Sequence, residues 1–212
     1  MQKLVDTIFS FTVTKKARLI DVFKLIYCLI VLFYIWAGVT IFENPKAALM
    51  FYDWGLAAGR TALSLFIIIL IPGIAERFGI RHKLIAILRI FRRYLGISMY
   101  LFVFMHLSFL WLILAIKTSV FFPILLFQMF GLIAAILLFF LFITSNDISV
   151  KNLNIGWYRI HRAIYIAMFF IFLHTALQRW SIWSVLMGIT LIFMIASFIY
   201  SFLKFGKKPY EK

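Results

Sequence analysis

Apolar residues form six long runs along the chain, and shorter segments that are rich in Lys and Arg separate them. A helix that crosses a bilayer needs about 20 mostly apolar residues, and each run has roughly that length. We therefore expect transmembrane helices over residues 22–42, 58–75, 94–116, 121–143, 160–177 and 182–203. The longest segments between them, residues 43–57, 76–93 and 144–159, have the length of loops. A single domain is expected.

Composition excludes the main alternatives to a membrane protein. Of the 212 residues, 65% are hydrophobic and only 14% are charged, whereas soluble domains average about 45–50% and 25%. A soluble enzyme of this size could not bury so much apolar surface, and a disordered chain needs low hydrophobicity. The single cysteine, Cys28, excludes an internal disulfide and a cysteine-ligated metal cluster. The fold class predicted is an all-α integral membrane protein, a six-transmembrane-helix bundle.

Basic residues give the expected orientation and the division of the chain. Eighteen of the 22 Lys and Arg residues lie on the side of the predicted bundle that holds both termini. Because cytoplasmic loops carry the excess of Lys and Arg, both termini are expected in the cytoplasm and the protein in the inner membrane. We expect an interfacial, amphipathic segment over 1–20, a membrane domain over 21–204 and a basic tail over 205–212. The net charge of +15 is explained in this way, without nucleic-acid binding.

Two histidines are the candidate functional residues inside the predicted spans. His106 and His174 lie about 18 Å and 21 Å along their helices from the cytoplasmic side, so the two imidazoles are expected at similar depth. Two such imidazoles on separate helices suit the axial ligation of a haem iron. A proton relay and simple hydrogen bonds between helices are the alternatives. A relay normally includes a carboxylate within the spans, and none is present there.

A second haem would need a further pair of ligands nearer the cytoplasm. His161 precedes His174 by 13 residues, which places the two side chains about 20 Å apart in height and roughly 140° apart around an ideal helix. The position that matches His161 on the third span is occupied by Arg92. His82 lies in the basic segment 81–83 and is expected to be solvated.

The order and spacing of these residues resemble the ferric-reductase-like transmembrane superfamily. Within it, the chain is most similar to the small bacterial branch that forms the haem-binding subunit of the periplasmic methionine-sulfoxide reductase system. The resemblance covers most of residues 56–180. It is carried by 59–63 (GRTAL), 92–96 (RRYLG), His106 with Leu107, Thr144 with Ser145, and Trp157, His161, Tyr165, His174 and Trp180.

The resemblance implies a bundle that transfers electrons across the membrane through haem b. It places His106 and His174 as ligands of an outer haem and His161 at an inner ligand position, where Arg92 replaces the expected partner. One haem is expected, and a second stays open, with service to a propionate or a quinone as the other role for His161. Arg60 and Arg92 are candidates to pair with haem propionates or another anionic group, and snorkelling to lipid phosphate is the alternative.

Donor and acceptor are expected to be separate molecules. Because no flavin or nicotinamide domain follows residue 203, electrons would come from a cytoplasmic flavin reductase, with FMN, or from a membrane quinol. A periplasmic methionine-sulfoxide reductase catalytic subunit is the most specific acceptor, and a ferric-reductase-like component with another acceptor is the runner-up. The short outer loops over 45–54 and 117–123 are the predicted docking sites. The alternative from a different class is a non-haem transporter, which predicts spans broken by glycine or proline. Pro72 and Gly73 are expected to interrupt the end of the second span, and no similar break is expected elsewhere.

Overall fold

Helices account for nearly all of the residues that the computed structural model describes, which are 2–118 and 124–206. Six of the helices found among these residues are long and apolar enough to cross a membrane. They are α2 (Lys16–Glu43), α3 (Ala48–Arg77), α4 (Lys83–Thr118), α5 (Leu126–Ile143), α7 (Ile155–His161) with α8 (Ala163–Gln178), which together form one span, and α9 (Ile182–Phe205). The described residues contain no strand. This confirms the predicted all-α, multi-pass membrane class.

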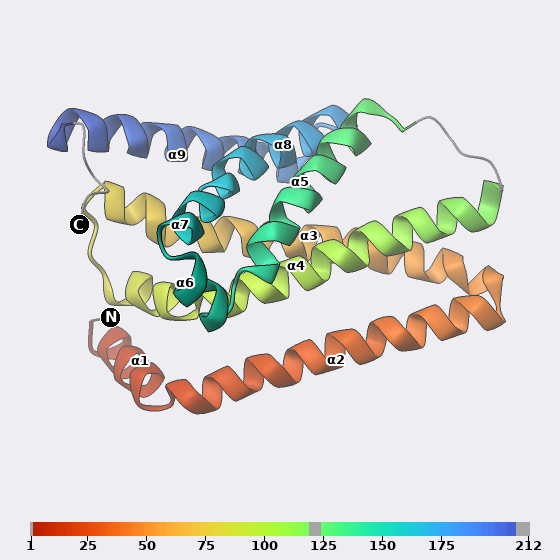
Figure 1. Ribbon diagram of the computed structural model, residues 1–212, viewed down its shortest axis with the longest axis horizontal. Coiled ribbons are helices and arrows are strands. Elements are labelled where there is room, and N and C mark those ends of the chain that lie inside the picture. Colours follow the sequence, from red (N-terminus) through yellow and green to blue (C-terminus); the bar gives the residue numbers. More distant parts are fainter. Residues whose placement is uncertain (1, 119–123, 207–212) are drawn as a thin grey trace.

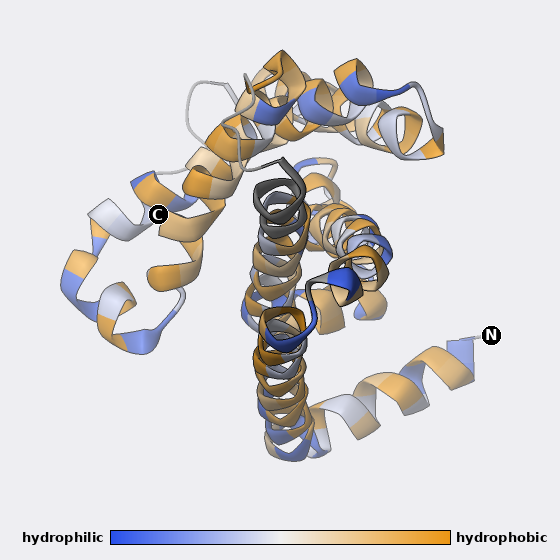
Figure 2. Ribbon diagram, turned by 90° about the vertical axis from the view of Figure 1, so that its right-hand side faces the viewer, coloured by the Kyte–Doolittle hydropathy of each residue, from blue (hydrophilic) through white to orange (hydrophobic). Residues whose placement is uncertain are grey.

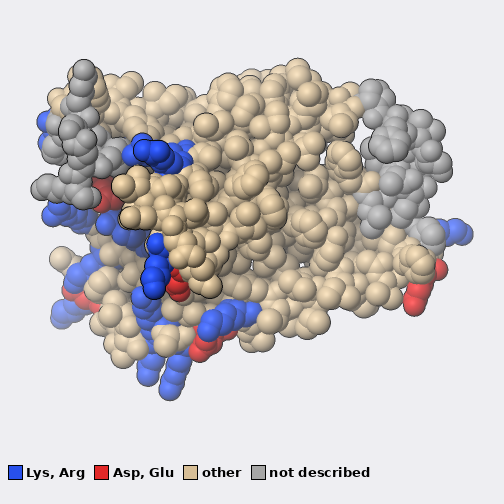
Figure 3. All heavy atoms as spheres, viewed as in Figure 1, with Lys and Arg blue, Asp and Glu red and all other residues tan. Residues whose placement is uncertain are grey.

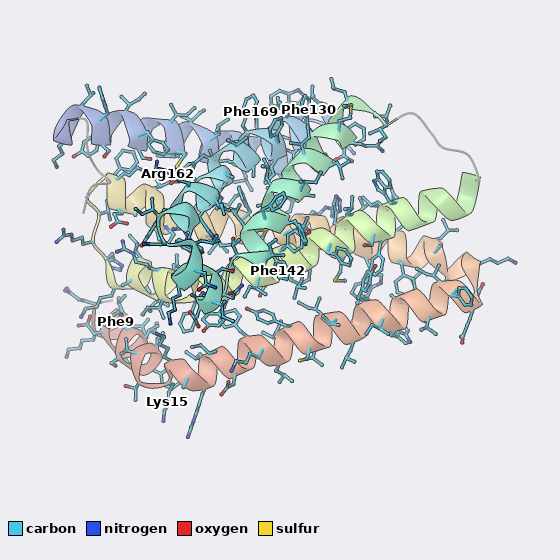
Figure 4. All side chains as sticks on the ribbon, viewed as in Figure 1. Phe9, Lys15, Phe130, Phe142, Arg162 and Phe169 are labelled. Carbon is cyan, nitrogen blue, oxygen red and sulfur yellow. The ribbon has the colours of Figure 1, made fainter. Side chains whose placement is uncertain are left out.

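The long helices alternate in direction and form two pairs that matter for the site. Figure 1 shows α3 and α4 as long antiparallel neighbours, with α5 and α8 crossing obliquely beside them. The buried core lies where the two pairs meet, and it includes Phe66 and Leu70 of α3, Met99 of α4, Leu138 of α5 and Met168 of α8. Aromatic contacts extend it: Phe142, labelled in Figure 4, stacks on Tyr100 with the ring centroids 4.7 Å apart. The α9 helix packs against α3 and α8.

Helix α2 lies at the side of the bundle and packs mainly through aromatic rings. Phe33 contacts Phe51 of α3 and Phe109 of α4, and the Tyr27 hydroxyl donates to the Tyr94 carbonyl at 2.7 Å. The outward side chains of α2 are apolar and exposed, among them Leu32 and Val39. Figure 2 shows that apolar residues cover outward as well as inward helix faces. Apolar groups on outward faces would be unfavourable in water, and lipid is the solvent that suits them.

The segments expected to be loops are largely helical. The stretch 43–57 holds a short 3₁₀ helix, η1 (Pro45–Ala47), which α3 follows directly. The prediction of a loop over 45–54 is therefore wrong. In the stretch 76–93, α4 begins at Lys83, and the stretch 144–159 contains α6 (Asp147–Leu153) and most of α7. These helices continue beyond the apolar runs because polar residues, solvated at a span's end, are compatible with helical hydrogen bonding. Of the predicted 117–123 loop, residues 117 and 118 belong to α4, and residues 119–123 lie outside the described residues.

Proline 72 does not interrupt the second span. Helix α3 runs unbroken through Pro72 and Gly73 as far as Arg77. A proline removes one helical hydrogen bond, and this one lies close to the helix end, so few bonds beyond it are affected. The prediction that Pro72 and Gly73 interrupt the span is therefore wrong, and these residues give no support to a transporter.

Charged side chains gather at the end of the bundle where the described chain begins, with α1 (Gln2–Thr14), and ends, with α9 (Ile182–Phe205). Figure 3 shows Lys and Arg concentrated there, while the middle of the same face is free of them. The first helix, α1, lies at this end and at an angle to α2 (Figures 1 and 2). An ion pair between Asp6 and Lys83, at 2.7 Å, ties α1 to the start of α4. The arrangement is the one expected for an N-terminal helix near a membrane surface.

Candidate haem-binding site

The structure brings His106 and His174 together. His106 lies on α4 and His174 on α8, and their ring centroids are 6.3 Å apart with the ring planes at 79°. Both side chains are partly buried between the two helix pairs. The matched depth along two helices predicts this meeting, but only the fold shows that the two rings face the same space.

Each imidazole is held by a backbone carbonyl of the neighbouring helix. Nδ1 of His106 lies 2.8 Å from the carbonyl oxygen of Gly55 on α3, and Nδ1 of His174 lies 2.8 Å from that of Phe127 on α5. A carbonyl only accepts, so each Nδ1 carries the proton and donates it. Each Nε2 then keeps its lone pair for another group. Among the described residues no partner is recorded for either Nε2.

This arrangement has the features of a metal-ligating histidine. Such a histidine almost always donates its second ring N–H to a carboxylate, a carbonyl or water, which fixes the tautomer and the ring orientation. A metal–imidazole nitrogen bond is about 2.0–2.1 Å long and that nitrogen lies about 1.1 Å from its ring centre, so two rings on opposite sides of one metal have centres roughly 6.3 Å apart. The observed separation of 6.3 Å agrees with that value.

Haem is the metal group that needs only two protein ligands of this kind. In the part of the chain that the structure describes, no group of three or more His, Cys, Asp or Glu side chains could hold a metal ion. A structural zinc site needs four protein ligands and a catalytic one three. In haem, the porphyrin supplies four nitrogens and the protein supplies the axial pair. The pair His106 and His174 therefore fits a bis-imidazole haem better than a simple metal site.

His161 is in a different chemical situation. Its Nε2 lies 3.2 Å from the Thr144 hydroxyl, which itself donates to the Phe140 carbonyl at 2.7 Å. Because the hydroxyl has one proton and donates it to Phe140, its oxygen must accept from the ring. Nε2 of His161 therefore carries the ring N–H. The ring also stacks on Trp157, with centroids 3.9 Å apart. No histidine faces it, because His106 and His174 face each other and His82 is exposed.

We expect His161→Ala to leave haem binding by the parent protein, which the pair His106 and His174 would provide, unchanged. The side chain is tied to Thr144 and Trp157, and its loss removes one hydrogen bond and one stacking contact, worth about 1–2 kcal/mol of stability together. Haem content per chain and the visible spectrum should equal those of the parent protein. A loss of half the haem would show instead that His161 binds a second group.

The candidate arginines differ in burial. Arg60, one residue after Gly59 on α3, is exposed, and no ion pair with another described residue is recorded for it. Arg92 on α4 is half-buried and close enough to Tyr165 and His161 to interact with them electrostatically. Its neighbour Arg93 pairs with Asp147 at 2.7 Å on the surface. Arg92 and His161 thus lie at the same level of the bundle, as their spacing predicts.

One functional candidate was not predicted from the sequence. Arg77 is nine-tenths buried and joins three helices at the basic end: its guanidinium donates to the Tyr165 hydroxyl of α8, lies 3.3 Å from the Gly73 carbonyl and lies 3.9 Å from the ring centre of Phe198 on α9. From the sequence, Arg77 is expected to lie in a loop, because the apolar run of the second span ends before it. Only the continuation of α3 shows that it faces the interior.

Two glycines beside the histidines are also part of the site. A Cβ atom at Gly59 would lie 2.5 Å from Nδ1 of His106, and one at Gly131 would lie 2.7 Å from Nδ1 of His174. The sequence drew attention to Gly59 only through the resemblance, and to Gly131 not at all.

Comparisons of this chain with models of protein families, with curated proteins and with solved structures give no match. The resemblance to the ferric-reductase-like superfamily therefore stays a prediction, and the case for a function depends on the chain's own geometry.

Proposed function

We propose that this chain is a haem b electron-transfer protein of the cytoplasmic membrane, with both termini in the cytoplasm. The observation that carries the proposal is the pair His106 and His174, with ring centres 6.3 Å apart and each Nδ1–H donated to a helix carbonyl. A haem held there would supply one-electron chemistry, and with both axial positions taken by imidazole it would offer no open position for a substrate.

The protein residues have separable tasks in this proposal. The carbonyls of Gly55 and Phe127 orient the two rings and increase the basicity of each Nε2, which favours binding to iron. The apolar ring of Phe127 lies beside His174, with the ring centroids 5.8 Å apart, and helps to keep water away. Exposed Arg60, near the His106 level of α3, is proposed to pair with a propionate.

Electrons are proposed to enter at the basic end of the bundle. Arg77, Arg92, Tyr165 and His161 lie together there, at the end where Lys and Arg gather (Figure 3). Guanidinium and phenol groups suit a donor that carries oxygen atoms, such as a quinol or FMN delivered by a flavin reductase. The electrons would leave at the opposite end to a periplasmic partner, for which a methionine-sulfoxide reductase catalytic subunit is the specific proposal and another ferric-reductase-like acceptor the runner-up.

Electron transfer is tested in vesicles that contain ferricyanide. The purified protein is reconstituted in liposomes, reduced FMN or a short-chain quinol is added outside, and the bleaching of the trapped ferricyanide is followed. We expect bleaching several-fold faster than in vesicles that hold the His174→Ala variant, which keeps the bundle but lacks one ring. Equal rates in the two preparations, at equal protein content, would contradict transmembrane electron transfer.

A further inference from the structure

The two histidines are held by the same local arrangement, which occurs twice on unrelated stretches of sequence. In each case the ring nitrogen meets the carbonyl of a residue on the neighbouring helix, and a glycine follows four positions later. The pairs are Gly55 with Gly59 on α3, facing His106, and Phe127 with Gly131 on α5, facing His174. The helix pairs α3–α4 and α5–α8 therefore present their imidazoles in matching ways.

Helix geometry explains why the fourth residue is the one that matters. In an α-helix the side chain at position i+4 points back along the axis and stands over the turn that contains residue i. A side chain at 59 or 131 would therefore cover the carbonyl to which the histidine donates. Glycine leaves that carbonyl open, so the same oxygen can accept both its own helical N–H and the imidazole N–H.

Gly59 and Gly131 are the two glycines at which an added Cβ would lie closer than 3.0 Å to another side chain. A Cβ at Gly59 would lie 2.5 Å from the His106 ring and one at Gly131 would lie 2.7 Å from the His174 ring, whereas at Gly38 and Gly96 a Cβ would meet nothing within 4 Å. The nearest other approach is 3.0 Å, from Gly55 to Phe109. Since contacts under 3.0 Å require something to move, an alanine at 59 or 131 must displace the imidazole itself.

We propose that Gly59 and Gly131 are positioning residues that fix the tautomer and the ring orientation of the two metal ligands. Each glycine lets one imidazole donate Nδ1–H to a helix carbonyl and so directs the Nε2 lone pair into the space between the helix pairs. The inference rests on the proposed function for the identity of the metal group. It does not rest on it for the tautomer, which is a property of the chain alone.

The haem-dependent test uses alanine at four glycines. Haemin is titrated into the apo-protein in detergent, and the dissociation constant and the low-spin paramagnetic resonance signal are measured. Because loss of a partner that orients a ligand typically costs 10–100-fold in metal affinity, we expect roughly that weakening, with altered g values, for Gly59→Ala and Gly131→Ala. The matched controls Gly96→Ala, on the helix of His106, and Gly38→Ala should behave as the parent.

A double variant separates displacement of the ring from failure to fold. In a His106→Gly background with added imidazole, the free ligand can move away from a new methyl group at 59. We expect Gly59→Ala to have a much smaller effect there than in the parent. An equal effect in both backgrounds, or parent-like affinity and g values in Gly59→Ala itself, would overturn the proposal.

A measurement without haem distinguishes this inference from the proposed function. With ¹⁵N-labelled histidine, apo-protein in detergent should show His106 and His174 as Nδ1–H tautomers, and Gly59→Ala should change only the His106 signals. If the parent binds no haem but the tautomers and their response are as stated, the proposed function fails and the positioning role stands. If haem binds and the tautomers do not respond, the positioning role fails alone.

Discussion

Alanine in place of His106 or of His174 is expected to abolish stable haem binding. In the proposed site each ring would supply one of two protein ligands, and Met105, next to His106, is buried in a separate aromatic cluster and would not replace it. We expect haem affinity to fall by roughly 100-fold or more, beyond the loss typical of an orienting partner. Haem content of the purified variant, from the pyridine haemochrome absorbance per chain, measures the effect.

The other two histidines are the controls for this experiment. His82→Ala changes an exposed residue in the turn before α4, and His161→Ala changes a ring that is bonded to Thr144. Both variants should keep the parent haem content. If His174→Ala retained the full haem content and the parent spectrum, the assignment of the ligands would be wrong.

Loss of the Arg77 side chain is expected to cause the second large effect, on stability. The guanidinium links α3 to α8 through Tyr165 and to α9 through the ring of Phe198 and the sulfur of Met194, which lies 3.1 Å away. A hydrogen bond to a charged group contributes about 1.5–3 kcal/mol and a desolvated cation–π contact up to about 2. Since alanine also leaves a cavity, Arg77→Ala should destabilise the protein by roughly 2–4 kcal/mol.

Thermal unfolding in detergent, followed by tryptophan fluorescence, measures this loss. Arg81→Ala removes an equal charge from an exposed position four residues away and should leave the midpoint unchanged. Haem content of folded Arg77→Ala at low temperature should equal that of the parent, because Arg77 lies at the basic end and touches neither histidine. An unfolding midpoint equal to that of Arg81→Ala would contradict the structural role given to Arg77.

The membrane fold could be predicted from the sequence because it depends on the length of apolar runs. All six predicted spans correspond to observed helices, although α3 and α4 each begin about ten residues before the apolar run. Helix ends were missed for a physical reason: apolar length reports how much helix lies in lipid, whereas hydrogen bonding continues into polar residues. The same error placed Arg77 in a loop.

The candidate site could be predicted only in part. Counting residues along two helices predicts that His106 and His174 lie at similar depth. Only the fold shows that the two rings face each other. The carbonyl that each ring meets depends on how α3 packs against α4 and how α5 packs against α8, and so does the room that Gly131 leaves for His174. No local pattern in the sequence encodes that packing. For His161, the 13-residue spacing to His174 suited a second haem, whereas the contact of its Nε2 with the Thr144 hydroxyl, at 3.2 Å, could not be predicted from spacing.

One haem is proposed to lie between α4 and α8 in each chain. The most direct test is the visible spectrum and the pyridine haemochrome of the parent protein, purified in mild detergent after expression with ample haem. We expect a red protein with one haem b per chain, whose bands sharpen on dithionite reduction as is typical of ligation by two imidazoles. A colourless, folded preparation would contradict this proposal.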